Sequence, residues 1–383
     1  MFFAKGIIWI LGFFVCMGVP INKDINKNDK LNVLVKESKE VILEKIIPLE
    51  ENEISKEEKK EVKLSAFEKA QNIDLKYEPN EVGQVMVIMY HKIGNQEGFC
   101  KRSISNFKKD LEMFKKDGYV TVSLEDYVQN TMDVPAGKTP IVLTFDDGHI
   151  SNFKVEEVDG EIVIDKESVV GIMEEFKKNN PDYSLTATFF LYGINPFMQE
   201  EYIDFKIDFL LKNGYQIGNH TYRHASFARM KNELQVEEAI GREKEFLDSF
   251  IDIEYDINTL AVPYGARSKR QVIENSLLDG KYRETEYKNI GIVNVGWDPN
   301  PSPIAKTFDP YNIHRVTGGS FEVGGVGIEN WMSFFRNSKK DKKRPMYISD
   351  GDSQVITVPK KYAEWIDFTK VKKDQYVKLY EME

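Results

Sequence analysis

The sequence predicts an α/β protein in which helices cover a parallel sheet. Short, continuous apolar runs, such as 85–90, 141–145 and 187–192, are typical of strands that are buried on both faces. Segments with apolar residues at helical spacing lie between several of these runs. This alternation favours either a barrel or an open, doubly wound sheet.

The individual elements follow from their patterns. Expected strands are the apolar runs 85–90, 119–122, 141–145, 187–192, 215–218, 260–263, 291–295 and 313–316. One expected helix has Phe107, Leu111 and Phe114 on a single face and ends before Gly118, a typical stop signal. Further helices are expected at 168–178, 203–212 and 233–250. Apolar and polar residues alternate over 153–165 around Asp159-Gly160, which predicts an inserted surface hairpin.

The N-terminal part of the chain differs in composition from the rest. Residues 1–20 combine one lysine with a long apolar run and predict an export signal or a short membrane anchor. Residues 21–80 are rich in Lys, Glu and Asn and are expected to form a solvated linker. We therefore expect the protein to be exported, either extracellular or tethered to the outer face of the cell membrane, with membrane contact only through the N-terminal segment.

Charge and cysteine content narrow the choice of partners. A formal net charge of −10 argues against nucleic acid or an anionic membrane surface as the main partner. Only Cys16 and Cys100 occur, so removal of a signal would leave no pair for an intrachain disulfide. We expect 81–335 to be the catalytic domain and 336–383 to be a small β extension packed on it.

Two adjacent aspartates, Asp146 and Asp147, follow the apolar run 141–145. Neighbouring carboxylates repel each other, so the pair requires a nearby positive charge or two divided chemical roles. Successive strand residues point to opposite faces, so both side chains reach one cavity only if the chain bends, which Gly148 permits. In parallel folds, the carboxyl ends of strands build the site.

A second polar segment supplies candidate metal ligands. His220 and His224 follow the run 215–218, and a spacing of four brings two imidazoles to one side of a helical turn or compact loop. Two imidazoles and one carboxylate leave coordination positions for water, as in catalytic sites for zinc or a similar divalent ion. With such an ion, one aspartate serves as a ligand and the other remains charged as a base.

At this point three segments, LTFDDGH (143–149), IGNHTYRH (217–224) and VPYGA (262–266), resemble the first three motifs of polysaccharide deacetylases of carbohydrate esterase family 4. The resemblance covers about 85–316 and implies a distorted (β/α)7-type NodB-homology barrel. It also implies that Asp147, His220 and His224 bind a divalent metal, most often Zn²⁺, with Co²⁺, Ni²⁺ or Fe²⁺ as alternatives. By the same resemblance, Asp146 is the base and the backbone N–H of Tyr264 binds the oxyanion.

The family's usual late L-x-H motif, which carries the general acid, is absent here. Met89-Tyr90-His91 is similar to that motif at the front of the chain, as in the permuted poly-N-acetylglucosamine deacetylase branch, so we expect His91 to be the acid, with His314 as the alternative. Ala261 stands where the family has an arginine that orients the base; Arg315 is expected either to replace it or to form a surface salt bridge. Trp297 is expected either to line the acetyl or sugar site or to lie in the core.

The sequence thus predicts a metal-dependent hydrolase that removes N-acetyl groups from a cell-surface or extracellular polysaccharide, such as peptidoglycan or poly-N-acetylglucosamine. One alternative is a non-catalytic carbohydrate-binding wall protein, which predicts loss of a ligand or of the base. Others are hydrolysis of another small amide on the same barrel and a two-histidine, one-carboxylate iron oxygenase. The last leaves Asp146 unexplained.

Overall fold

The computed structural model describes residues 64–318, 327–337 and 343–382. From Leu64 onward the chain forms one compact unit. The predicted signal segment 1–20 and most of the predicted linker lie outside the described residues. The helices of the described part are all too short or too polar to span a bilayer.

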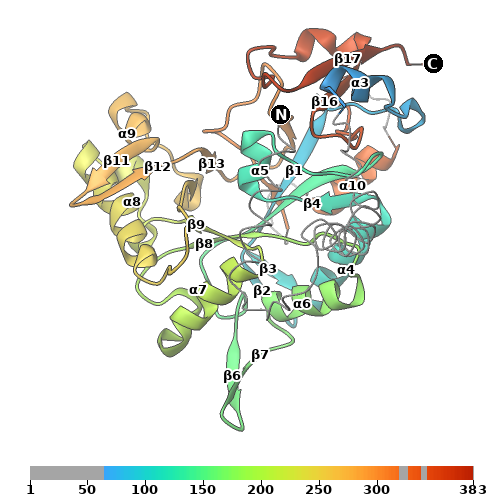
Figure 1. Cartoon of the computed structure of the whole chain (residues 1–383). Coiled ribbons are helices and arrows are strands. Elements are labelled where there is room, and N and C mark those ends of the chain that lie inside the picture. Colours follow the sequence, from blue (N-terminus) through green and yellow to red (C-terminus); the bar gives the residue numbers. More distant parts are fainter. Residues whose placement is uncertain (1–63, 319–326, 338–342, 383) are drawn as a thin grey trace, which may run out of the picture. The chain divides into compact units, whose positions relative to one another are not determined.

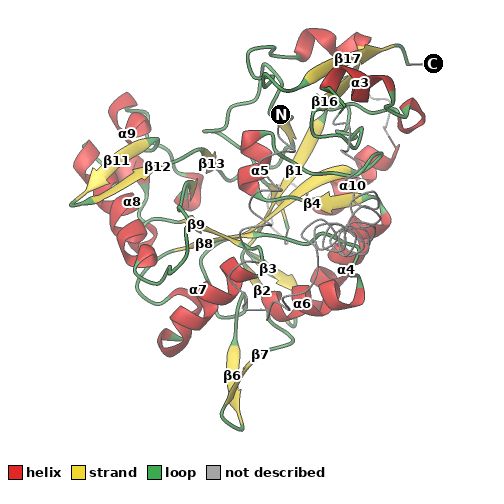
Figure 2. Ribbon diagram, viewed as in Figure 1, coloured by secondary structure: helices red, strands yellow, loops and turns green. Residues whose placement is uncertain are grey.

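A curled parallel sheet forms the centre of this unit and confirms the predicted α/β class (Figure 2). Its successive neighbours are β1 (Gln84–Tyr90), β5 (Thr139–Phe145), β8 (Thr188–Leu191), β9 (Gln216–Asn219), β10 (Thr259–Ala261) and β13 (Gly291–Val293), each parallel to the next. At the start of this sheet, β4 (Tyr119–Thr121) pairs with β5, and β14 (Asn300–Pro301) pairs antiparallel with β1.

The segment 313–317 closes the sheet into a ring. Ile313 forms a parallel bridge with Val293 of β13, and β15 (Val316–Thr317) pairs in parallel with β1. The two edges of the sheet are therefore joined through one short segment. This closure decides between the two architectures that the sequence left open, in favour of the barrel.

Helices cover the outside of the barrel, as the sequence predicted (Figure 1). They are α4 (Ile104–Lys116), α5 (Leu124–Gln129), α6 (Val169–Asn179), α7 (Ile203–Lys212), α8 (Glu233–Asp248), α9 (Gln271–Ser276) and α10 (Ile328–Asn337). In α4, Phe107, Leu111 and Phe114 are buried on one face, and Ser103 caps the first turn by accepting from the N–H of Asn106. Short 3-10 turns are η1 (Leu75–Tyr77), η2 (Pro196–Met198), η3 (Glu200–Tyr202), η4 (Tyr222–His224), η5 (Phe227–Arg229), η6 (Pro263–Gly265) and η7 (Lys360–Trp365).

Alternate residues of the strands belong to two different cores. In β1, Val85 and Val87 pack with residues of β5, β8, β10 and β13 inside the ring, whereas Met86 and Ile88 pack outward under the helices. Gly218 of β9 faces inward as well, and a side chain there would collide with the ring of Phe190. This period-two pattern fixes which residues beyond the strand ends point into the barrel.

The predicted hairpin is confirmed as β6 (Val155–Val158) and β7 (Glu161–Ile164), which project away from the barrel at the bottom of Figure 1. Its two turn residues, Asp159 and Gly160, both have positive φ, as a two-residue hairpin requires. Two further small sheets were not predicted from the sequence. They are the hairpin of β11 (Asp279–Tyr282) with β12 (Thr285–Lys288) and the parallel pair of β2 (Lys92–Gly94) with β3 (Lys101–Ser103).

At the end of the chain, β16 (Val355–Pro359) and β17 (Tyr376–Tyr380) form a parallel pair. The predicted linker 21–80 is wrong for its last part, because α3 (Ala66–Gln71) is folded against this pair and begins with a capping box at Ser65. The predicted boundary at 335/336 also falls inside α10.

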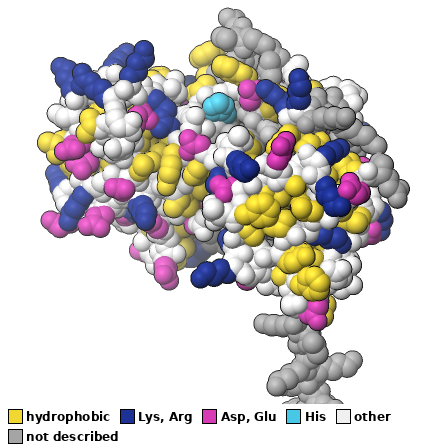
Figure 3. All heavy atoms as spheres, turned by 90° about the horizontal axis from the view of Figure 1, so that it is seen from above, with side chains coloured by type: hydrophobic (Ala, Val, Ile, Leu, Met, Phe, Trp, Pro, Cys, Tyr) yellow, Lys and Arg dark blue, Asp and Glu magenta, His cyan; other side chains and the backbone are white. Residues whose placement is uncertain are grey.

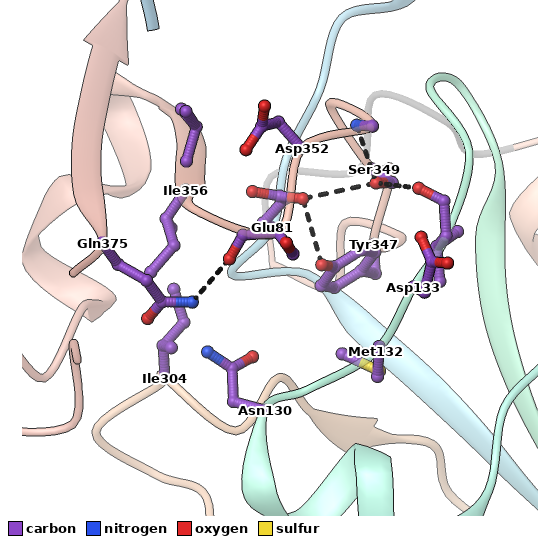
Figure 4. A pocket seen from close by; sticks show the side chains of 14 residues that line it. Glu81, Asn130, Met132, Asp133, Ile304, Tyr347, Ser349, Asp352, Ile356 and Gln375 are labelled. Carbon is purple, nitrogen blue, oxygen red and sulfur yellow. Dashed lines mark hydrogen bonds between the residues drawn. The ribbon is translucent and has the colours of Figure 1, made fainter. Parts of the chain in front are cut away.

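Residues 345–350 cover the amino ends of the barrel strands, where the backbone of Tyr347 bonds with Gln84 and Thr139. Close by, a small pocket contains the buried side chain of Glu81 (Figure 4). On the face shown in Figure 3, hydrophobic, acidic and basic side chains are interspersed.

Candidate metal centre and active site

The site lies at the carboxyl end of the barrel. His91, Asp146 and His220 directly follow β1, β5 and β9. Each continues the inward-facing series of its strand, for example Val87 to His91 in steps of two. The backbone ladder extends this far, since Asp146 N–H donates to the carbonyl of Tyr90 at 2.9 Å. Three distant segments therefore bring their side chains to one opening.

Asp147 reaches the same opening because the chain leaves the strand at this residue. Its φ is 75°, and the φ of Gly148 is 56°. The sequence placed the bend at Gly148, whereas the structure begins it one residue earlier, at a non-glycine residue in the left-handed region. Such a conformation costs energy and is typical of functional sites.

His224 comes to the site through a compact loop, one of the two alternatives for the H-x-x-x-H spacing. Thr221, Arg223 and His224 all have positive φ. The loop is held by Thr221, whose Oγ1 accepts from the N–H of Ala225 at 2.8 Å and whose N–H donates to Asn219 Oδ1 at 2.8 Å. As a result, the Nε2 atoms of His220 and His224 lie 3.1 Å apart.

Asp147, His220 and His224 form a three-residue cluster that fits a divalent metal ion. Asp147 Oδ1 lies 3.6 Å from His220 Nε2 and 3.7 Å from His224 Nε2, and one ligand atom from each residue lies within 4.8 Å of the others. His220 Nδ1 lies 2.9 Å from the carbonyl of Ala261, to which it donates, so its Nε2 lone pair faces the cluster. Burial and the neighbouring His220 lower the pKa of His224 to about 4, so the ring is neutral, as a ligand must be.

The other aspartate, Asp146, forms a buried ion pair with Arg315. The guanidinium donates to both carboxylate oxygens at 2.6 Å, and the exposed fractions of Asp146 and Arg315 are 2% and 0%. Arg315 also donates to Thr144 Oγ1 at 3.1 Å and to the carbonyl of Asn294 at 3.0 Å. Burial alone would raise the pKa of Asp146, but the charge and hydrogen bonds of Arg315 outweigh it and lower that pKa. Of the two arrangements expected for Arg315, the structure has the one that orients Asp146.

The two candidate acids have different surroundings. His91 is mostly buried, and its Nε2 lies 3.9 Å from Asp146 Oδ2. His314 is exposed, because it precedes the inward-facing Arg315 in the closing strand, and its backbone is bonded on both sides to Asn300. The structure therefore brings His91 to the site and leaves His314 outside the barrel.

Tyr264 and Trp297 are both exposed, by 68% and 65%. The ring of Tyr264 lies 4.3 Å from that of His224, edge to face, and its φ of 60° turns the chain at η6. Trp297 follows β13 at the same end of the barrel, and its carbonyl accepts from the indole N–H of Trp331 at 2.5 Å. Its side chain is not in the core, and no contact with the metal ligands is found among the described residues.

Three neighbours of the site were missed in the sequence. Tyr192 ends a predicted strand, and its ring lies 5.1 Å from that of His224. Ser151 and Asn152 contact the segment around His91 from the loop after Asp147. The position of Tyr192 at a strand end was a usable signal, whereas short polar residues in a loop are too common to be one.

Residues 133–279 match the family described as polysaccharide deacetylase. This region is a polysaccharide deacetylase domain. It contains Asp146, Asp147, His220, His224 and Tyr264, whereas His91, which follows β1, and Arg315, in the closing segment 313–317, lie outside it.

Individual proteins similar to this chain are described as deacetylases. The peptidoglycan-N-acetylglucosamine deacetylase of Bacillus cereus is 29% identical over 172 residues, which are 45% of this chain and 51% of that protein. The chain thus spans about half the length of this curated relative. Among solved structures, the polysaccharide deacetylase BC0361 of Bacillus cereus is 17% identical, with a TM-score of 0.47 over 65% of this chain and 68% of that one. The deacetylase PplD of Streptococcus pyogenes is 15% identical, with a TM-score of 0.45 over 65% and 97%.

Proposed function

We propose that this protein is an exported, metal-dependent hydrolase that removes N-acetyl groups from a cell-surface or extracellular polysaccharide. The observation that carries the proposal is the close approach of a two-histidine, one-aspartate cluster to a second aspartate that is held by its own arginine. A purely structural metal site would need the two histidines and Asp147 but would give no reason for a second aspartate with its own arginine. The alternative of a non-catalytic wall protein predicts loss of a metal ligand or of the base, and it lacks support because all four of these residues are present.

Asp147, His220 and His224 would hold the metal, for which nitrogen and oxygen donors favour Zn²⁺, with Co²⁺, Ni²⁺ or Fe²⁺ as alternatives. When bound, a divalent ion polarises the acetamide carbonyl and makes water more acidic. The carbonyl of Ala261 fixes the orientation of the His220 ring, which supports its role as a ligand.

Asp146 is the proposed base, which accepts a proton from the water that attacks the acetamide carbon. Its two hydrogen bonds to Arg315 support this role in two ways. They keep the carboxylate charged at the pH of the reaction, and they hold its plane in one orientation. Arg315 is therefore a positioning residue for the base, in place of the arginine that Ala261 replaces.

His91 is the proposed general acid for the departing amine, because an amide anion is too poor a leaving group to depart unprotonated. Burial lowers the pKa of His91, although the charges of Asp146 and Asp147 oppose this effect. The ring is thus mainly neutral at rest and must gain its proton during the reaction. Asp146 is the proposed source of that proton, which it takes from water; its Oδ2 lies 3.9 Å from His91 Nε2, so the two side chains must first approach to hydrogen-bond distance.

Tyr264 and Trp297 are proposed to contact the substrate. The backbone N–H of Tyr264 would donate to the oxyanion, and the contact of its ring with His224 supports a location beside the metal ligands. The exposed indole of Trp297 would lie against an acetyl methyl or a sugar face. Exposed aromatic rings at an open barrel end suit a chain-like glycan, and the peptidoglycan deacetylase among the similar proteins supports such a substrate.

The position of β1 supports membership in a permuted branch of the deacetylases. β1 carries His91 and precedes the region matched to the family, which begins at residue 133. Parallel pairing nevertheless sets β1 beside β5, so the proposed acid lies next to the proposed base. A chain order in which the acid comes first is thus compatible with the barrel.

Acetate release by the full-length protein tests this function on peptidoglycan, poly-N-acetylglucosamine and chitin oligomers. We expect release from at least one, its loss with chelator and its return with Zn²⁺. Asp146→Asn should lower the rate by roughly 10²- to 10⁴-fold. The matched control is Asp208→Asn, at a half-buried α7 residue paired with Lys212, which should retain full activity. Chelator-insensitive release, or full activity of Asp146→Asn, would contradict the proposal.

A further inference from the structure

His91 lies just beyond the regular sheet. The last backbone bond from β5 to β1 ends on the carbonyl of Tyr90, and β5 then turns away at Asp147. On the other side, the last bond is from Gly318 N–H to the carbonyl of Met89, at 2.8 Å. Beyond these bonds the chain continues into β2, where Lys92 N–H donates to the carbonyl of Cys100 at 3.1 Å, so the His91–Lys92 peptide lies between the main sheet and the small β2–β3 pair.

Two side chains from the loop 149–152 also hold this segment. Asn152 Nδ2 donates to the carbonyl of His91 at 2.6 Å, and Ser151 Oγ accepts from the N–H of Ile93 at 3.0 Å. The other end of the Asn152 carboxamide accepts from the N–H of His149 at 3.0 Å. Both polar ends of this side chain are thus bonded, as its complete burial requires.

The loop itself is fixed to a rigid element. The carbonyls of Ser151 and Asn152 accept from the N–H groups of Val169 and Val170 in the first turn of α6, both at 3.0 Å. The N–H of Asn152 donates to the carbonyl of His149 at 2.8 Å. Asn152 therefore transmits the position of α6 and of the Asp146–Asp147 loop to the backbone of His91.

We propose that Asn152 is a positioning residue that holds the His91 imidazole beside Asp146 for protonation of the leaving amine. The inference rests on the proposed function, in which His91 is the acid. Without the Asn152 bond, the His91–Lys92 peptide loses the partner of its carbonyl and keeps the bond from Lys92 N–H to Cys100, so it can tilt about that bond and the ring can move relative to the substrate nitrogen. A shift of about 1 Å in a catalytic group lowers rates by about 10²-fold.

The test compares two substrates of the full-length, zinc-loaded protein. Cleavage of an N-acetylglucosamine oligomer needs protonation of an amine, whereas 4-nitrophenyl acetate releases a phenolate that needs none. Asn152→Leu, which removes the bond at similar size, should lower kcat for the oligomer roughly 10- to 100-fold and for the ester less than about 3-fold. His91→Gln should show the same selectivity, with a larger loss.

Asn289→Leu is the matched structural control, because Asn289 is also buried and donates to a carbonyl, that of Leu277, at 2.7 Å. It should lower stability without changing the ratio of the two activities. If Asn152→Leu does not fold, Asn152→Asp keeps the shape and the acceptor of the side chain but loses the donor. Equal losses on both substrates in the Asn152 variant, with selective loss in His91→Gln, would overturn this inference alone. Absence of selectivity in His91→Gln would overturn the assignment of the acid and this inference with it.

Discussion

The two ends of the barrel each contain a buried carboxylate, Asp146 at the carboxyl end and Glu81 near the amino end, with exposed fractions of 2% and 5%. Asp146 faces a guanidinium at 2.6 Å. Glu81 instead accepts from neutral donors, namely Tyr347 OH at 3.1 Å and Ser349 Oγ at 3.4 Å (Figure 4). It also accepts from the backbone N–H groups of Asp350 at 3.3 Å and Thr357 at 2.9 Å.

The difference decides the charge state of each group. The pKa of Asp146 is lowered because Arg315 outweighs the effect of burial. The pKa of Glu81 is raised well above its usual value by burial and by the charge of Asp350, and burial raises the pKa of Asp350 to about 6. Similar burial thus yields a charged carboxylate at one end and, at the other, a carboxyl group with a raised pKa that is hydrogen-bonded to the C-terminal segment.

Arg315→Met should make Asp146 resemble Glu81 and have the largest effect. An unpaired buried carboxylate costs about 3–5 kcal/mol at neutral pH, and activity should fall with it. In the wild type, the lowered pKa stabilises the fold above about pH 4, and this stability is lost as the pH falls. The variant should instead lose stability as the pH rises above about 4, as measured by urea unfolding across pH.

The control for this substitution is Arg344→Met, which removes an exposed arginine 3.0 Å from Asp298 and should cost less than about 1 kcal/mol. Equal losses in the free energy of unfolding for the two substitutions would show that the buried ion pair stabilises the fold no more than the exposed one.

Combining Arg315→Met with Asp146→Asn should restore part of the lost stability, because the double variant leaves no unpaired charge. We expect a coupling free energy of about 0.5–3 kcal/mol from a double-mutant cycle in urea, with deacetylation still absent. Strict additivity of the two single losses would mean that the residues do not interact, contrary to the 2.6 Å contacts.

Glu81→Gln should flatten the pH dependence of stability by about 1 kcal/mol or more between pH 5 and 8 and leave deacetylation unchanged. Raised pKa values stabilise the fold at low pH, and that stability is lost as the pH rises through them. The exposed Glu284→Gln is the control and should leave the profile unaltered. If stability depended on pH as steeply in Glu81→Gln as in the wild type, the raised pKa of Glu81 would not contribute to that dependence.

His314→Gln should have the smallest effect, because the side chain is exposed on the outside of the closing strand. Activity should change by less than roughly twofold and stability by less than about 0.5 kcal/mol. Loss of acetate release comparable to that of His91→Gln would reassign the acid to the outer face of the barrel.

The carboxyl end was more accessible to sequence reasoning than the amino end. Asp146, Asp147, His220 and His224 stand at the ends of apolar runs, so the strand pattern predicted that they would meet. The structure brings Asp147, His220 and His224 within 4.8 Å of one another, and the roles of all four residues stay proposals. Glu81 directly follows the segment 21–80 that composition assigned to a linker, and its partners are more than 250 residues away along the chain. Such a pairing leaves no local pattern.

The support around the site was harder to predict for the same reason. Arg315 had two expected environments, because one arginine near a strand end does not reveal whether it points inward. The structure resolves this through the register of the closing strand, which depends on β1 and β13 together. Asn152 and Ser151 act through hydrogen bonds to a segment about 60 residues away, and short polar residues carry no periodic signal.

The closing segment 313–317 also determines when the proposed site becomes complete during folding. Residues 313–317 join β13 to β1, and Arg315 in their middle is the counter-ion of Asp146. A nascent chain that has folded only as far as β13 already contains Asp147, His220 and His224, yet Asp146, the proposed base, has no cation beside it. If the proposed function holds, we expect hydrolysis to begin only after the segment 313–317 has docked and closed the ring.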